Sequence, residues 1–220
     1  MIQDLFAFLN FGGPVVLILI GFSVVATTLA LLKLWQFFRM RKVNGAEPSL
    51  LISLVEKSET NQVKLMSKGQ ANPRAKLISQ AVDLFEKQTM SIADIKQELA
   101  RNARQSISKL DEYLRPLEVI ATIAPLLGLF GTVLGMIEAF QAMEAAGKNV
   151  NPAILSGGIW QALLTTAVGL AVAIPVSMVH SYFERKVERE ALAIQDDLAR
   201  ISTHFASKLE HKKSVGMENV

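Results

Sequence analysis

Cysteine is absent from the 220-residue sequence, and charged side chains are absent from three long stretches of it. Without cysteine the chain forms no disulfide and carries no thiolate chemistry, and this absence says nothing about its compartment. The uncharged stretches cover 5–32, 119–137 and 149–183 and are 28, 19 and 35 residues long. Each contains a run of about 18 or more mostly apolar residues, which favours three membrane spans and disfavours a soluble enzyme.

The composition also excludes other classes of protein. Half of the residues are hydrophobic and a fifth are charged, which excludes intrinsic disorder. The net charge is +3, but its uneven distribution along the chain argues against nucleic-acid binding. The sequence has no phosphate-cradling glycine loop, no His-Glu-x-x-His motif and no visible constellation of Ser, His and Asp. We therefore predict no enzyme activity, no cofactor and no metal site.

Three transmembrane helices are predicted, because a helix needs about 20 residues to cross a bilayer core about 30 Å thick. We expect them at 14–38, 117–140 and 154–183. The first begins at Pro14, and proline is well placed at a helix start. A secretory signal is the alternative for this run, but it would carry positive charge before the apolar residues. The first basic residue here is Lys33, which we expect to snorkel to the membrane surface.

Lysine and arginine are divided unevenly among the segments outside the spans. The 39–116 segment carries fourteen and 184–220 carries seven, whereas 1–13 carries none and 141–153 carries only Lys148. Positive charge marks the inner side of a membrane. We therefore expect the N-terminus and the 141–153 loop outside. The 39–116 helical domain and the C-terminal helix and tail are expected inside.

Apolar residues spaced by three or four predict helices outside the membrane as well. One stripe covers 92–117, begins at a capping pair of Ser91 and Asp94, and leads directly into the second span. Pro116 and Pro125 lie on this path, and each removes a backbone hydrogen bond, so we expect kinks there.

A second stripe covers 187–205, directly after the third span, and a shorter helix is expected at 77–85. The two long helices are expected to project into the cytoplasm and to pack on each other or on neighbouring copies. The predicted fold class is therefore an all-α membrane protein with three transmembrane helices, two of them extended into long cytoplasmic helices.

Small and hydroxyl-bearing residues mark one face of each of the last two spans. On the second span these are Pro125, Gly128, Thr132 and Gly135, and on the third they are Ala162, Thr166, Gly169 and Ala173. Gln161 and Thr165 are assigned to a different side. One interpretation is that the two faces form tight helix–helix seams, with the threonines bonded to local carbonyls. The other is that they line a polar passage or a partner's helix. Spacing alone favours the seam.

The second span has Glu118 and Glu138 at its two ends, where we expect them at the membrane interfaces, and no carboxylate or lysine between them. The third span contains none at all. Ionisable residues within the membrane are the usual mark of proton relays. If protons cross here, the titrating group therefore belongs to another chain.

Two long motifs resemble the ExbB/TolQ/MotA proton-channel family, and its ExbB branch most. They are Ala124-Pro-Leu-Leu-Gly-Leu-Phe-Gly-Thr-Val-Leu-Gly-Met136 and Gly158-Ile-Trp-Gln-Ala-Leu-Leu-Thr-Thr-Ala-Val-Gly-Leu-Ala-Val-Ala-Ile-Pro175. The resemblance is strong over 110–189. It implies a homopentamer around a central pore in the inner membrane of a Gram-negative bacterium, with a periplasmic N-terminus and a cytoplasmic C-terminus.

The resemblance also implies partners. The pore would surround a dimer of a single-span chain resembling ExbD or TolR, whose intramembrane Asp carries protons. Movement of that dimer would drive a third protein resembling TonB or TolA. TonB-linked import of siderophores or haem is favoured, and a Tol-type motor for outer-membrane integrity is the nearest alternative. A flagellar stator fits less well, and a non-conducting membrane scaffold is the alternative from another class.

The family's functional threonines correspond here to Thr132 and Thr166, which are expected to line the pore near the partner's Asp. Gln161 stands where the family usually has Glu, and glutamine cannot carry a proton at physiological pH. We therefore expect Gln161 to contact the pore or partner without relaying protons. The remaining expected pore or partner contacts are Pro125, Gly128, Gly135, Ala162 and Gly169.

Overall fold

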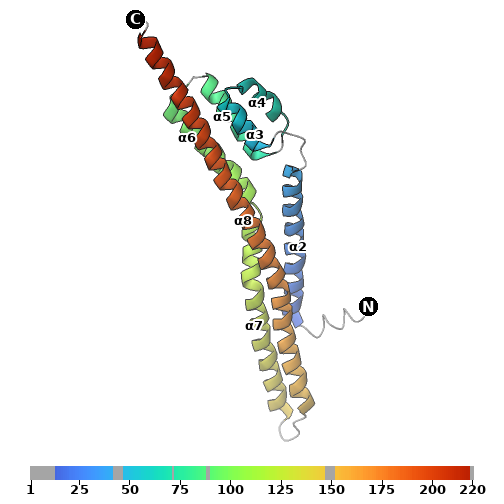
Figure 1. The fold of residues 1–220 in the computed structure, drawn as a ribbon. Coiled ribbons are helices and arrows are strands. Elements are labelled where there is room, and N and C mark those ends of the chain that lie inside the picture. Colours follow the sequence, from blue (N-terminus) through green and yellow to red (C-terminus); the bar gives the residue numbers. More distant parts are fainter. Residues whose placement is uncertain (1–12, 42–46, 71, 88–89, 147–151, 219–220) are drawn as a thin grey trace. The chain divides into compact units, whose positions relative to one another are not determined.

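The computed structural model describes residues 13–41, 47–70, 72–87, 90–146 and 152–218. Every element in these ranges is an α-helix (Figure 1). The helices are α2 (Gly13–Arg41), α3 (Pro48–Glu56), α4 (Thr60–Ser67), α5 (Pro73–Lys87), α6 (Ile92–Asp111), α7 (Leu114–Ala146) and α8 (Pro152–Glu218). The all-α prediction is therefore confirmed for the described residues.

Three of these helices are long and apolar enough to cross a membrane. The candidate spans lie within Gly13–Met40 of α2, Leu114–Ala145 of α7 and Leu155–Lys208 of α8. In lipid a helix satisfies all of its own backbone hydrogen bonds, and the described parts of the uncharged stretches, 13–32, 119–137 and 152–183, are helical. Of the predicted outer segments, 1–12 and 147–151 lie outside the described residues, whereas 141–146 continues α7 and 152–153 begins α8.

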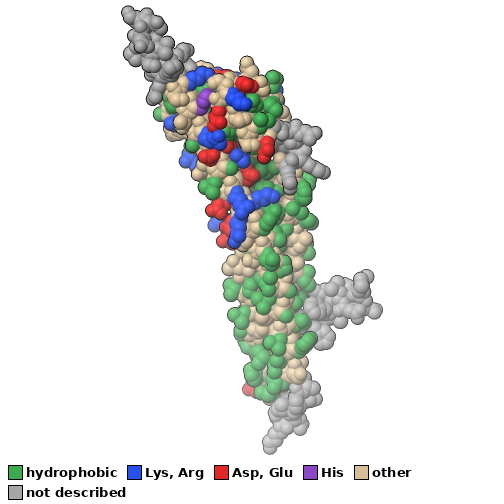
Figure 2. Space-filling view, viewed as in Figure 1, with side chains coloured by type: hydrophobic (Ala, Val, Ile, Leu, Met, Phe, Trp, Pro, Cys, Tyr) green, Lys and Arg blue, Asp and Glu red, His purple; other side chains and the backbone are tan. Residues whose placement is uncertain are grey.

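The chain divides into two compact units. The membrane unit comprises 1–33 and 113–183, and the charged unit comprises 34–112 and 184–220. The last turns of α2 and the C-terminal half of α8 belong to the charged unit. In Figure 2 the blue and red side chains gather over the charged unit, whereas the α7 and α8 part of the membrane unit is mostly green and tan.

The membrane unit packs α2, α7 and the first part of α8 together. Its buried cluster contains Val15, Leu19, Ala124 and Ala173, with Phe22, Leu127, Leu134, Val168 and Val172 against them. Large apolar side chains such as Leu126, Phe130 and Ile174 remain more than half exposed. Such an exposed apolar surface is expected where a helix faces lipid or another membrane helix.

The charged unit has its own hydrophobic core. Its largest cluster draws residues from α3, α4, α5, α6 and the C-terminal half of α8. Phe85 of α5 and Phe205 of α8 stack with ring centroids 4.9 Å apart. In a second cluster Ala103 of α6 packs with Ile194 of α8. The prediction that the 92–117 and 187–205 stripes pack on each other is therefore confirmed within this chain.

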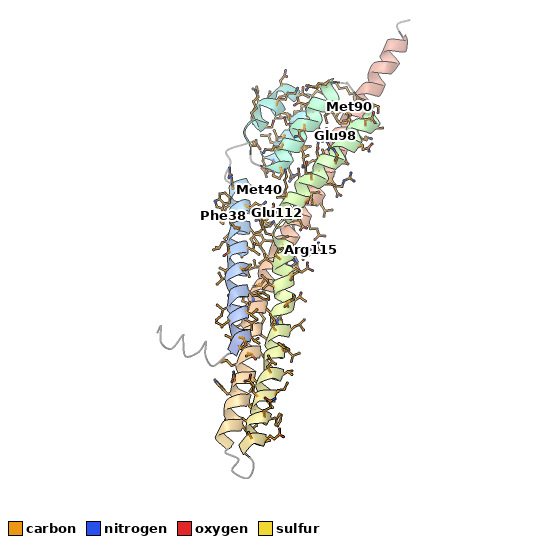
Figure 3. The ribbon with its side chains drawn as sticks, turned by 180° about the vertical axis from the view of Figure 1, so that it is seen from behind. Phe38, Met40, Met90, Glu98, Glu112 and Arg115 are labelled. Carbon is orange, nitrogen blue, oxygen red and sulfur yellow. The ribbon has the colours of Figure 1, made fainter. Side chains whose placement is uncertain are left out.

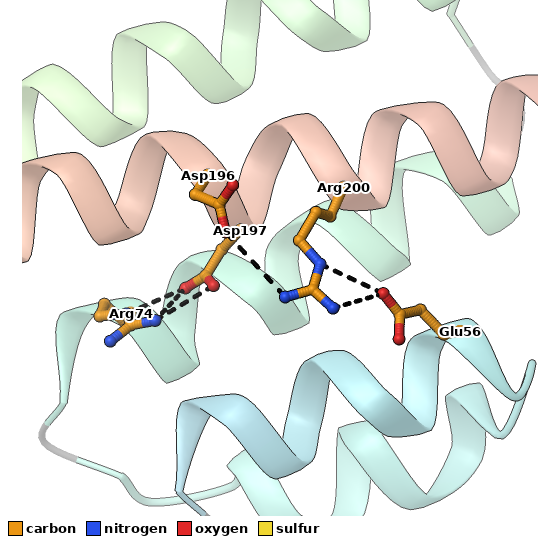
Figure 4. A network of polar contacts seen from close by, with 5 residues as sticks. All are labelled: Glu56, Arg74, Asp196, Asp197 and Arg200. Carbon is orange, nitrogen blue, oxygen red and sulfur yellow. Dashed lines mark hydrogen bonds and ion pairs between the residues drawn. The ribbon is translucent and has the colours of Figure 1, made fainter.

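Two ion pairs join the C-terminal half of α8 to the shorter helices (Figure 4). The Arg74 guanidinium donates to both carboxylate oxygens of Asp197, at 2.9 and 3.1 Å. Arg200 donates to Glu56 Oε1 at 2.7 Å through Nη2. The side chain of Asp197 is only 6% exposed, and the two hydrogen bonds from Arg74 replace the water that its carboxylate loses on burial.

The sequence predicts that the 92–117 stripe leads directly into the second span with a kink at Pro116, but the structure has a break between two helices there. The α6 helix ends at Asp111 and α7 begins at Leu114, with Tyr113 at a φ of 72° between them. Pro116 explains the break, because the ring of a proline clashes with the carbonyl four residues earlier in a continuous helix. That carbonyl belongs to Glu112. Within the first turn of a new helix, Pro116 is tolerated.

The start of α6 follows the prediction. The hydroxyl of Ser91 accepts a hydrogen bond from the backbone N–H of Asp94 at 3.2 Å and donates to its carboxylate at 2.6 Å. This arrangement satisfies one of the backbone donors that have no partner within the helix. The predicted capping pair is confirmed.

Candidate functional site

The seam between α7 and α8 in the membrane unit brings the predicted small residues together. A Cβ added at Gly128 would lie 3.0 Å from the carbonyl oxygen of Thr165, and one at Gly169 would lie 2.7 Å from the carbonyl oxygen of Ala124. At Gly135 it would lie 3.1 Å from the Cβ of Ala162. These glycines therefore allow the two backbones to approach more closely than side chains would permit.

The seam contains a small polar centre. The Thr165 hydroxyl lies 3.2 Å from the carbonyl oxygen of Gly128 and 2.7 Å from that of Ala162. The Thr166 hydroxyl donates to the same Gly128 oxygen at 3.1 Å. Two consecutive hydroxyls of α8 thus converge on one carbonyl of α7, which has two lone pairs to accept them.

Thr165 was assigned to a different side of the third span, and that assignment is wrong. The residue is 3% exposed and lies inside the seam. Positions 162, 165, 166 and 169 follow the i, i+3, i+4, i+7 rule, so all four share one helical face. Gly131 was also missed: a Cβ there would lie 2.6 Å from the Thr165 hydroxyl oxygen. The i+3 spacing of Gly128 and Gly131 was the available signal.

Thr132 has a different environment from Thr166. Its hydroxyl donates to the carbonyl of Leu129, one turn earlier on its own helix, at 2.6 Å. Both threonines are half-buried, so each leaves part of its side chain accessible. The described contacts place Thr166 on the seam and leave Thr132 bonded within α7.

Gln161 lies near the start of α2. A Cβ added at Gly13 would lie 3.6 Å from the Nε2 atom of Gln161, and Gly13 has a φ of +63° that disfavours any other residue. Gln161 and Pro125 are both half-buried. A neutral amide at this position offers hydrogen bonds without a charge.

Lys33 does not reach the surface, contrary to the expectation of snorkelling. It is fully buried in the described structure.

Over the described residues, no group of three or more His, Cys, Asp or Glu side chains is arranged to hold a metal ion. The seam itself is built from neutral hydroxyls, carbonyls and small residues. Such a site supplies hydrogen bonds and close packing.

Outside the membrane unit, Lys64 of α4 bridges two acids of α5. Its ammonium lies 2.7 Å from a carboxylate oxygen of Asp83 and 2.6 Å from one of Glu86. The hydrogen bond to Asp83, with that to Glu86, raises the pKa of Lys64 above its ordinary value. The hydrogen bond from Lys64 lowers the pKa of Glu86. These pairs attach the α4 helix to α5.

Comparison with known proteins identifies the family of this chain. The family model described as the MotA/TolQ/ExbB proton channel family matches residues 53–196. A biopolymer transport protein ExbB homologue of Methanothermobacter thermautotrophicus is 29% identical over 200 residues, covering 83% of this chain and 67% of the relative.

Two further relatives carry the names of the two branches. The biopolymer transport protein exbB1 of Vibrio cholerae is 48% identical over 62 residues, which are 28% of this chain and 27% of that protein. The Tol-Pal system protein TolQ of Haemophilus influenzae is 33% identical over 112 residues, covering 51% of this chain and 46% of the relative. With three apolar helices long enough to span a bilayer and a family match over 53–196, this multi-pass membrane protein belongs to the MotA/TolQ/ExbB proton channel family, a family of transport subunits and not of enzymes.

Proposed function

We propose that this chain is the stator subunit of an inner-membrane proton channel that drives import through the outer membrane. A homopentamer would enclose an ExbD-like dimer, and the complex would use proton-motive force to move a TonB-like protein. The observation that carries the proposal is the family match across the neutral α7–α8 seam. A seam of hydroxyls and carbonyls supplies hydrogen bonds along a path while a partner supplies the titrating group.

The proposed proton path runs along the accessible parts of Thr132 and Thr166. Both are half-buried, and both are bonded through their hydroxyl hydrogens to carbonyls, so their oxygen lone pairs remain available as acceptors. Gln161, Pro125 and the seam glycines would then position these hydroxyls against the partner helix.

The test removes each hydroxyl while keeping the side-chain shape. Thr132→Val and Thr166→Val are compared with Thr27→Val, because the Thr27 hydroxyl also bonds one turn back on its own helix, to Ser23 at 2.8 Å, but on α2. We expect the first two variants to co-purify with the partner and to lose about ten-fold in energised uptake, and Thr27→Val to keep it. Full uptake by an assembled Thr132→Val or Thr166→Val complex would refute the proton path.

The oligomer and its partners are tested by native mass spectrometry of the tagged complex purified from its own membrane. We expect five copies of this chain with two copies of a small single-span chain bearing a membrane Asp. A complex without any such chain would leave the proposed proton path with no titrating group and would favour the scaffold alternative.

The Tol-type alternative is supported by the TolQ relative, which aligns over 51% of this chain. The two functions differ in the third protein and in phenotype. A deletion strain that grows poorly only when iron is supplied as a siderophore supports TonB-linked import. A strain that leaks periplasmic protein and is sensitive to detergent supports the Tol-type motor instead.

The absence of cysteine makes the proposed orientation directly testable. Single cysteines can be introduced by Ser91→Cys and Lys148→Cys. Position 91 belongs to the charged unit, and position 148 belongs to the predicted outer loop. A membrane-impermeant maleimide should label position 148 in intact cells and position 91 only after the inner membrane is opened. The reverse pattern would place the N-terminus inside.

A further inference from the structure

A cavity of about 550 Å³ lies in the charged unit where the end of α2 meets α5 and α6. Each of the three helices contributes one cation to its lining: Arg39, Lys76 and Lys109. Among the described residues that line it, none is Asp or Glu. The amide of Gln36 donates to the backbone carbonyl of Lys109 at 3.2 Å, which fixes the end of α2 against the end of α6.

One wall of the cavity is the end of a candidate membrane span. That span extends to Met40, so Trp35 and Arg39 lie on its last two turns, and Figure 3 labels Phe38 and Met40 there. Trp35 is 62% exposed, and the Arg39 guanidinium lies over its ring, 5.4 Å from the centroid. Exposed tryptophan beside arginine is typical of the depth at which lipid headgroups lie.

The lining chemistry selects an anion that also carries a hydrogen-bond donor. Three cations without an acid favour a phosphate, which arginine and lysine bind through charge-assisted hydrogen bonds. The Gln36 Oε1 atom is buried and has no hydrogen-bond partner among the described residues, while its Nε2 is already committed to Lys109. This amide orientation leaves an acceptor that a ligand hydroxyl or ammonium would satisfy.

We propose that this cavity, lined by Arg39, Lys76, Lys109 and Gln36, binds the headgroup of an anionic glycerophospholipid. The phosphate lies among the three cations, and a headgroup hydroxyl donates to Gln36. The acyl chains leave past Trp35 into the bilayer. The bound lipid thereby links the end of the first span to α5 and α6. The inference depends on α2 spanning a membrane and does not depend on proton conduction or on any partner chain.

The chain contains a matched control cavity. A second cavity of about 560 Å³ lies between α6 and the C-terminal half of α8 and is lined by two cations, Lys96 and Arg104. The described residues that line it include no acid, no aromatic residue and no residue of α2. The double variant Lys96→Gln/Arg104→Gln therefore removes the same charge from a cavity of the same size at a different place.

The experiment titrates the purified full-length protein with phosphatidylglycerol or phosphatidylcholine and counts bound lipids by native mass spectrometry. Each cation beside an anionic headgroup contributes about five-fold in binding. We expect Lys76→Gln/Lys109→Gln to weaken phosphatidylglycerol binding about 5- to 25-fold without affecting phosphatidylcholine. The Lys96→Gln/Arg104→Gln control should bind as the unmodified protein does. Equal binding of the two lipids, or equal loss in the control, would overturn the proposal.

Two further arms separate the sources of the phosphate. If glycerol 3-phosphate binds as tightly as the lipid, with the same dependence on Lys76 and Lys109, the site takes a soluble anion and the lipid assignment is wrong. Circular dichroism checks that each variant is folded. If the double variant unfolds, Lys76→Gln alone serves as the test, because Lys76 is an exposed residue whose substitution leaves the core intact.

Discussion

The hydroxyl oxygen of Thr165 lies 3.2 Å from the carbonyl oxygen of Gly128, across the seam between α7 and α8. The neighbouring Thr166 hydroxyl donates to the same oxygen. In lipid no water competes for these bonds, and so the pairing satisfies the buried Thr165 hydroxyl and the half-buried Thr166 hydroxyl and fixes the register of the two helices. Any pore built from several copies would contain this seam once in each subunit.

The close approach at Gly169 should not tolerate a methyl group. A Cβ there would lie 2.7 Å from the Ala124 carbonyl oxygen, whereas a Cβ at Gly21 meets nothing within 4 Å. We expect Gly169→Ala to destabilise the protein by about 1–3 kcal/mol through overpacking. Gly21→Ala should be neutral or slightly stabilising, because alanine favours the helix. Thermal unfolding in detergent compares the two, and equal melting temperatures would refute the tight seam.

The two seam hydroxyls should be energetically coupled. They share the Gly128 carbonyl, so removing one leaves that oxygen with the other donor. We expect Thr165→Val and Thr166→Val each to cost about 0.6–1.7 kcal/mol, and the double variant to cost more than their sum. A double-mutant cycle on unfolding in detergent measures this, and strict additivity would mean that the hydroxyls act independently.

The buried carboxylate of Asp197 should contribute far more to the folding stability than the exposed carboxylate of Asp196. Asp197→Ala removes the bidentate partner of Arg74, whereas Asp196 is 69% exposed and lies 4.0 Å from Arg200. We expect Asp197→Ala to cost about 1–3 kcal/mol, since Arg74 is left half-buried and unpaired. Asp196→Ala should change the stability by less than about 0.5 kcal/mol. Similar losses for both would show that the ion pair contributes little.

Loss of the Ser91 hydroxyl should loosen the start of α6. The side chain accepts from the Asp94 N–H, and alanine cannot replace that bond. We expect Ser91→Ala to cost about 0.5–2 kcal/mol. Ser108→Ala, on an exposed position later in the same helix, should cost nothing. Hydrogen exchange of the first turn of α6 provides the local readout, and unchanged protection would contradict the cap.

The bridge between Lys64 and α5 should weaken in acid. The pKa of Glu86 is lowered from its ordinary value of 4.5, chiefly by the hydrogen bond from Lys64. The contribution of this carboxylate to the folding stability is therefore complete above pH 4.5 and is lost as the pH falls through the lower pKa of the folded state. The pKa of Lys64 is raised from 10.5, so the ammonium keeps its charge throughout this range.

The check compares the unmodified protein with Lys64→Met from about pH 7 to about pH 3. Because the pair lies near the surface, the difference in unfolding free energy at neutral pH should be about 0–1 kcal/mol. The difference should shrink as Glu86 is protonated. Lys57→Met, on an exposed position after α3, should show no such trend. A difference that grows in acid would contradict the assignment.

Some parts of the site were readable from the sequence and others were not. The spacing of Gly128, Gly135, Ala162 and Gly169 identified small helical faces correctly, because the helical period is fixed. The prediction for Thr165 is wrong because one helical face is wide enough to include both the i+3 and the i+4 position. Only the packing of α8 against α7 shows which residues lie at the centre of that face. The break at Tyr113 was missed because Pro116 was read as a kink within one helix.

The sequence by itself determined the helical class, the three candidate spans and the family. Long stretches without charge must bury their backbone hydrogen bonds in lipid, and a helix is the only local structure that does so. Only the tertiary structure decided which atoms meet. Arg74 and Asp197 are 123 positions apart, and Thr166 and Gly128 are 38 apart. Contacts over such separations depend on how helices pack, and packing is set by the fit of whole surfaces and not by any local pattern.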